Sequence, residues 1–178
     1  VTYQGLLGTG IKHETTVSIA RTDDLVRATY QLSMQVTEDT DFSRLVLFQV
    51  GADTYNTTRE KKFAVGSNLN LSQEWSATWG DNVYRSSPIQ RLGSNPWVSF
   101  HEGEKIGQED KGPGANRGFV IRKWKAQLGG KKAQPWVRER GIGRNNRESS
   151  IIDLLPPPEV TSLKSGDYLE ATIEHLVI

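Results

Sequence analysis

The segment Val26–Val36 reads VRATYQLSMQV, and apolar and polar side chains alternate along its whole length. A period of two places one set of side chains in a core and the other in water, which is the pattern of a strand in an antiparallel sheet. The end of the chain, 168–178, repeats this pattern. One face carries Leu169, Ala171, Ile173 and Val177, and the other carries Glu170, Thr172 and Glu174. These two segments therefore predict long strands, each with one buried face.

Shorter strand candidates lie elsewhere in the chain, which brings the expected total to about ten strands at the spacing of a sandwich or barrel. They are Thr15–Ala20, Arg44–Val50, Lys61–Val65, Trp97–His101, Phe119–Leu128, Gln134–Arg138 and Ser150–Leu155. No stretch repeats apolar residues with a helical period, and 17 glycines and 7 prolines interrupt the chain. We therefore predict an all-β fold: an antiparallel two-sheet β-sandwich of jelly-roll-like type with little helix. The expected core comprises Tyr30, Leu32, Met34, Leu45, Leu47, Phe119, Ile121 and Ile173.

The length of 178 residues fits a single domain that spans the whole chain. No cysteine is present, which excludes disulfides, thiolate zinc sites and cysteine nucleophiles. No apolar run is long enough to span a membrane as a helix. The chain begins with Val1 and not with Met, and we expect a module excised from a larger protein, whose other domains would be partners.

The ligand-binding residues are expected on a long polar connection, because loops of such length are usually functional or disordered. Two connections qualify, Ser76–Pro96 and Glu102–Gly118. The first holds a dense mixture of rings and polar groups, and a flat ring flanked by hydrogen-bonding groups suits a sugar. The predicted binding residues are Trp79, Asp81, Tyr84 and Arg85, with Trp136 and Arg138 as further contributors. The alternative is that the loop folds back and buries Trp79 as a plug, whereas Trp97 and Trp124 are assigned to the core.

Positive charge is concentrated between Arg117 and Arg147, where ten basic residues stand against the single acid Glu139. One interpretation is structural: this basic segment lies against acidic strands and forms cross-strand ion pairs. The other is a cationic face for a polyanion such as a uronate or a sulfated glycan. No nucleic-acid partner is expected, because no recognition motif accompanies the charge and the net charge of the chain is +1.

Carboxylates and amides gather in three places: Glu38–Asp41, Asp53 with Asn56, and Glu102–Asp110. Calcium takes six to eight oxygen ligands, and loops at strand ends can supply them, so a structural calcium ion is an open alternative to plain solvated polarity. No other cofactor is expected. The three histidines show no metal-ligand spacing, although His101 beside Glu102 is a candidate general base.

Two stretches carry a resemblance: 42–56, FSRLVLFQVGADTYN, and 165–175, SGDYLEATIEH. Both resemble β-sandwich domains of secreted bacterial polysaccharide-degrading proteins. The resemblance implies a secreted or cell-surface setting and a plant or algal polysaccharide as partner, and it assigns no catalytic residue. The leading hypothesis is a non-catalytic carbohydrate-binding module. The alternatives are the sandwich portion of a glycoside hydrolase or polysaccharide lyase, and a structural spacer domain.

Overall fold

The computed structural model describes residues 1–6, 10–52, 59–77, 89–105, 116–142 and 149–178. These residues form two main antiparallel sheets and a short strand pair, with no helix among them. The large sheet contains β1 (Thr2–Leu6), β2 (Ile11–Arg21), β3 (Val26–Val36), β6 (Arg59–Ser67), β7 (Asn70–Ala77), β9 (Pro96–Lys105), β10 (Arg117–Leu128), β11 (Lys131–Lys132) and β15 (Tyr168–Val177). The small sheet contains β5 (Phe48–Ala52), β8 (Gln90–Arg91), β12 (Trp136–Ile142) and β13 (Ser149–Leu155). The short pair joins β4 (Thr40–Asp41) to β14 (Ser162–Leu163).

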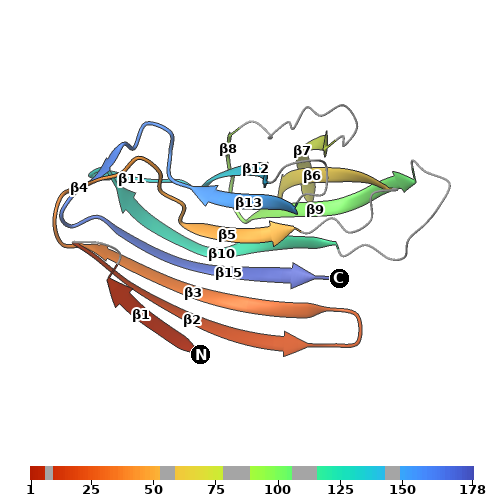
Figure 1. Cartoon of the computed structure of the whole chain (residues 1–178), viewed down its shortest axis with the longest axis horizontal. Helices are drawn as coiled ribbons and strands as arrows, with labels where there is room; N and C mark the ends of the chain where they lie inside the picture. The colour runs from red at the N-terminus through yellow and green to blue at the C-terminus, as the bar shows by residue number, and fades with distance from the viewer. Residues whose placement is uncertain (7–9, 53–58, 78–88, 106–115, 143–148) are drawn as a thin grey trace.

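The large sheet runs in the order β1-β2-β3-β15-β10-β9-β6-β7, with β11 paired to β10. Figure 1 shows β1, β2, β3, β15 and β10 side by side in one curved layer. Its centre brings together distant parts of the chain, because β15 lies between β3 and β10 and pairs antiparallel with both. The predicted all-β, antiparallel architecture with two main sheets is confirmed.

One hydrophobic core lies between the two sheets. The ring of Phe48 in the small sheet packs edge-on against Phe119 and Tyr30 of the large sheet, with ring centroids 5.9 and 5.0 Å away. Four predicted core residues are buried: Met34, Phe119, Ile121 and Ile173. The other four, Tyr30, Leu32, Leu45 and Leu47, are only partly buried but pack against this core.

A β-bulge in β10 reverses the alternation of its side chains. Before the bulge, Phe119 and Ile121 face the core; after it, Trp124 and Ala126 do. The register with β15 shifts between Ile121 and Lys123, so Arg122 has no partner residue on β15 in this register. A strict period of two would have turned Lys123 and Lys125 inward and Trp124 outward. The bulge lets three basic residues of the sequence RKWK remain exposed while the tryptophan packs inward.

Several predicted element bounds were wrong. Residues 44–47 are not a strand, and β5 begins at Phe48, because the preceding residues serve other contacts: the Arg44 guanidinium lies 3.2 Å from the Asp153 carboxylate. The strand predicted from Gln134 starts instead at Trp136, after Pro135. The connection predicted at Glu102–Gly118 is shorter than expected, since β9 continues to Lys105 and β10 begins at Arg117.

Candidate functional site

The outer face of the large sheet, opposite the core, carries ordered rows of polar side chains. Strand pairing aligns Gln127 with Tyr168, Tyr168 with Gln35, and Gln35 with Lys12, across β10, β15, β3 and β2. The neighbouring row is likewise aligned and contains Lys125, Glu170, Ser33, Glu14 and Gln4. Because strands alternate, these side chains project away from the core on a rigid backbone.

Three hollows on this face join into one polar groove. Their volumes are about 380, 360 and 480 Å³. The first two share Lys125 and Tyr168, and the last two share Ser33 and Gln35, so the hollows adjoin one another across the strands. We call this the outer groove. The polar residues that line it include Lys132, Gln127, Lys125, Tyr168, Glu170, Gln35, Ser33, Lys12, Glu14 and Gln4.

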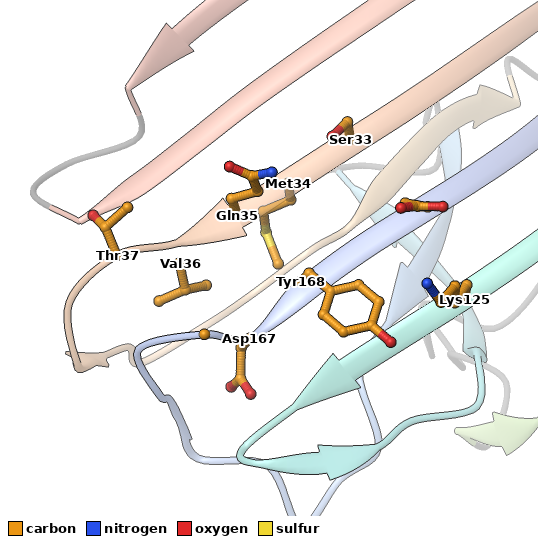
Figure 2. Close-up of a pocket in the computed structure, with 10 residues that line it drawn as sticks. Ser33, Met34, Gln35, Val36, Thr37, Lys125, Asp167 and Tyr168 are labelled. Atoms are coloured by element: carbon orange, nitrogen blue, oxygen red, sulfur yellow. The ribbon is translucent and has the colours of Figure 1, made fainter.

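Tyr168 is the aromatic residue in the middle of the outer groove. Figure 2 shows its ring lying between Gln35 of β3 and Lys125 of β10. The Lys125 ammonium lies 5.1 Å from the ring centroid, within the range of a cation–π interaction. A half-buried ring bordered by amide, ammonium and carboxylate groups can stack against an apolar surface while its neighbours hydrogen-bond hydroxyls.

Asp167 fixes the end of β15 on which Tyr168 lies. Its carboxylate is 1% exposed and accepts hydrogen bonds from the backbone N–H groups of Gly129 at 2.6 Å, Gly130 at 3.0 Å and Lys164 at 2.8 Å. Gly129 and Gly130 both have positive φ, which glycine adopts without strain. The buried carboxylate thereby joins the turn after β10 to the turn before β15. Its oxygens are occupied by these bonds, so its role in the groove is structural.

The carboxylates of the outer groove have hydrogen-bond partners, whereas three of its ammonium groups form no close ion pair within the described residues. Glu170 accepts a hydrogen bond from Lys123 at 3.0 Å, and Glu14 accepts one from the side-chain amide of Gln4. The hydrogen bond from Lys123 and the nearby positive charges hold the pKa of Glu170 below its usual value. No carboxylate of the described residues lies within ion-pair distance of Lys12, Lys125 or Lys132.

Of the six binding residues predicted from the sequence, only two lie in the part of the chain that the structure describes. Trp79, Asp81, Tyr84 and Arg85 lie outside the described residues. Trp136 and Arg138 lie on β12 in the small sheet, and neither lines the outer groove. The Arg138 guanidinium is 3.5 Å from the buried carboxylate of Asp153, which also accepts a hydrogen bond from Gln49 at 2.6 Å. This ion pair gives Arg138 a structural contact, and its part in binding stays a prediction.

Part of the basic segment forms the cross-strand ion pairs that the structural interpretation predicts. Arg122 contacts Glu174 at 2.8 Å, and Lys123 contacts Glu170 at 3.0 Å, both between β10 and β15. Lys125 and Lys132 belong to the same segment but have no such pair among the described residues. The structural interpretation therefore holds for Arg122 and Lys123, and the cationic face for a polyanion stays a prediction.

His101 lies in a polar cluster on β9 and its neighbouring strands. Its Nδ1 is 2.8 Å from the Ser99 hydroxyl, and its Nε2 is 3.5 Å from the Glu74 carboxylate, which also pairs with Lys62 at 3.1 Å. A serine, histidine and glutamate in this order resemble a hydrolase relay. However, the backbone at Ser99 is paired on both sides, with β6 and with β10, so the strand offers no free pair of N–H groups for an oxyanion. Both ring nitrogens of His101 also have neighbours already.

Metal ligands are not clustered in the part of the chain that the structure describes, where no three His, Cys, Asp or Glu side chains gather. Asp39, from one of the predicted calcium groups, binds the Ser165 backbone N–H at 2.9 Å and the Lys164 ammonium at 3.0 Å. Asp53 and Asn56 lie outside the described residues. The calcium prediction therefore stays untested.

His175 faces the core side of β15, as its alternation predicts. Its Nε2 atom is buried and has no hydrogen-bond partner among the described residues. Burial, followed by the nearby positive charge of Arg117, lowers the pKa of this histidine below the usual value of 6.5. The imidazole is therefore a neutral group of the fold at physiological pH.

Sequence reasoning predicted binding residues on a loop, and it did not single out Tyr168, the central ring of this candidate site, although a signal was present. The alternation of 168–177 assigns Tyr168 to the polar face, together with Glu170 and Thr172. An aromatic ring bordered by polar groups on the water-facing side of a strand is a candidate stacking surface. The residues that surround it come from other strands, and their proximity follows only from the strand order.

Within the described residues, no helix has the length and hydropathy needed to cross a membrane. Comparison of the chain with protein-family models, with curated proteins and with solved structures finds no match.

Proposed function

We propose that this protein is a non-catalytic carbohydrate-binding module that holds a polysaccharide in the outer groove. The observation that carries the proposal is the continuous hollow across β10, β15, β3 and β2, with the Tyr168 ring at its centre. A polysaccharide is an extended ligand with alternating apolar ring faces and hydroxyl edges. An open groove with one stacking ring and amides on either side complements both features.

A rigid sheet also favours binding without large rearrangement. The groove residues of β3, β10 and β15 lie on strands whose opposite face belongs to the core, so their backbone is ordered before a ligand arrives. Preorganisation lowers the entropic cost of association. We propose a secreted or cell-surface setting, where such a module would bring attached domains to an insoluble or extended substrate.

The test is a panel of soluble plant and algal polysaccharides, measured by affinity electrophoresis and calorimetry with wild-type protein and two variants. Tyr168→Ala removes the ring from the groove, and we expect it to weaken binding at least tenfold, while Tyr168→Phe retains the stacking surface and most of the affinity. The control is Tyr3→Ala, because Tyr3 is 59% exposed on the opposite face of the same sheet. Equal affinity of Tyr168→Ala and wild type would exclude the outer groove as the site.

The loop residues predicted from the sequence are tested in the same panel. Trp79→Ala and Trp136→Ala would lose affinity without a lower melting temperature if those rings bind the glycan. Adding a chelator to each titration tests the calcium prediction, since a structural calcium ion would make both binding and melting temperature depend on the chelator.

A catalytic portion of a carbohydrate-active enzyme is the second candidate, and the Ser99–His101–Glu74 cluster is the observation that favours it. A turnover assay on polysaccharides and on acetylated or methyl-esterified forms separates the two functions. Product formation that disappears in His101→Ala, with Tyr168→Ala still active, would replace the binding-module proposal.

A further inference from the structure

At the end formed by β10 and β11, the outer groove has more ammonium groups than carboxylates among the described residues. Lys132 and Lys125 line one end of the groove and Lys12 lines the other. Glu170 lies opposite Lys125 and accepts a hydrogen bond from Lys123, so this one carboxylate is shared by two ammonium groups. At the other end, Glu14 accepts a hydrogen bond from the neutral amide of Gln4 and keeps its negative charge near Lys12. An ammonium without an acidic partner at the border of a hollow keeps its attraction for an external anion.

The two ends of the groove are separated by a distance that suits an extended chain. Lys125 lies on β10 and Lys12 on β2, three strands apart in the sheet. With neighbouring strands about 4.8 Å apart, the two backbone positions are separated by roughly 14 Å. The whole groove, from β10 to β1, crosses four such intervals and spans about 19 Å. A single sugar cannot contact both ends, whereas a short oligosaccharide can.

Building on the proposed function, we infer that the ligand is an anionic glycan, a chain carrying uronate carboxylates or sulfate groups, that lies across the strands. Its central ring stacks on Tyr168, and its anionic groups approach Lys125 and Lys132 at one end and Lys12 at the other. The pKa of Glu170, held low by Lys123 and Lys125, agrees with a positive potential at this end of the groove. Carboxylate and sulfate share the chemistry that the three ammonium groups recognise.

The experiment compares glycans that differ only in charge. Polygalacturonate is titrated against its fully methyl-esterified form, and chondroitin sulfate against desulfated chondroitin, by calorimetry at low and at high sodium chloride. We expect the charged member of at least one pair to bind tighter, and its affinity to fall with salt because exposed charges are screened. Tighter binding of polygalacturonate than of its ester would indicate carboxylate recognition, and tighter binding of chondroitin sulfate than of its desulfated form would indicate sulfate recognition.

Adjacent residues of β11 supply a matched pair of variants. Lys132 lines the groove, whereas Lys131 pairs with Leu128, whose side chain faces the core, and does not line it. We expect Lys132→Gln, Lys125→Gln and Lys12→Gln each to weaken binding of the anionic glycan about two- to fivefold, the range of one exposed ion pair. Lys131→Gln should leave the affinity unchanged. The triple groove variant should lose most of the salt dependence, and circular dichroism should show every variant folded.

The outcomes distinguish this inference from the proposed function. If charged and neutral members bind equally and the lysine variants have no effect, but Tyr168→Ala abolishes binding, the groove binds glycans and the inference is wrong. If Lys131→Gln weakens binding as much as Lys132→Gln, the attraction is a general effect of net charge, and the inference is also wrong. If no glycan binds at any salt concentration, the proposed function itself fails.

Discussion

Replacing Asp167 by asparagine is expected to destabilise the fold strongly, although the two side chains have the same shape. One carboxylate oxygen accepts the backbone N–H groups of Gly129 and Lys164, and the other accepts that of Gly130. An asparagine must place an NH₂ group where one of these oxygens lies. At least one backbone N–H donor would then face another donor inside the protein. The remaining hydrogen bonds would be weaker, because their acceptor would no longer carry a negative charge.

The magnitude follows from the number of contacts. A hydrogen bond to a charged group contributes about 1.5–3 kcal/mol, and one or two of the three backbone bonds are lost. Because Asp167 is 1% exposed, water cannot replace them. The expected loss is about 3–5 kcal/mol of the free energy of unfolding, which corresponds to a fall in melting temperature of roughly 6–20 °C for a protein of this size.

Thermal and urea unfolding, followed by circular dichroism, measure this loss. The control is Asp39→Asn, since Asp39 binds the Lys164–Ser165 turn next to Asp167 but its side chain is 62% exposed. Its effect should be much smaller, because water can take over both of its contacts. A change of less than about 1 kcal/mol for Asp167→Asn, the size of an average neutral hydrogen bond, would refute the assigned role of this carboxylate.

Three further predictions concern the fold. Gly66→Ala should destabilise by about 1–3 kcal/mol, because an added Cβ would lie 2.0 Å from the ring of Trp97 and 2.5 Å from a backbone oxygen; an unchanged melting temperature would contradict this. Ile173→Ala, at a fully buried position, should lower the free energy of unfolding by about 2–5 kcal/mol. Leu32→Ala, at a half-buried position, should lower it by about 1–2 kcal/mol. Urea titrations measure both losses, and a larger loss for Leu32→Ala would mean that the core is misplaced. The pKa of His175 is lower in the folded protein than in the unfolded chain, so the unfolded chain binds the proton more tightly. The contribution of this histidine to the free energy of unfolding should therefore be fully present above pH 6.5 and decrease as the pH falls below that value. A His175→Phe variant that remains folded should show a weaker decrease, and an identical pH profile would argue against the shift.

The fold class could be read from the sequence because its main signal is local. The alternation of Val26–Val36 indicates directly which face of β3 is buried, and in the structure that face lies toward the core. The bulge in β10 could have been inferred too, since a strict period of two would bury Lys123 and Lys125. By contrast, β1 and β7 were missed. Both are edge strands whose segments do not alternate clearly, and their pairing depends on the adjacent strands β2 and β6.

The site was less accessible to sequence reasoning because it depends on which strands become neighbours. Tyr168 and Gln35 are 133 positions apart in the chain and face each other only because β15 pairs with β3. Arg138 shows the same dependence on long-range pairing. In the sequence it is one of several cations near a tryptophan, but the buried carboxylate of Asp153 binds it in the small sheet. Local composition identifies the residue types of a site, and long-range pairing decides which of them meet.

The separation of the two faces of the large sheet has a consequence for engineering. In β15, Tyr168 and Glu170 point outward while Leu169 and Ala171 point into the core. Exchanges at outward positions leave the buried set intact, so many of them should be tolerated at little cost in stability. The outer rows of β3, β10 and β15 can then be randomised together as a combinatorial library, with the core as an unvaried scaffold. New binding specificities could be selected from one fold without redesigning its packing.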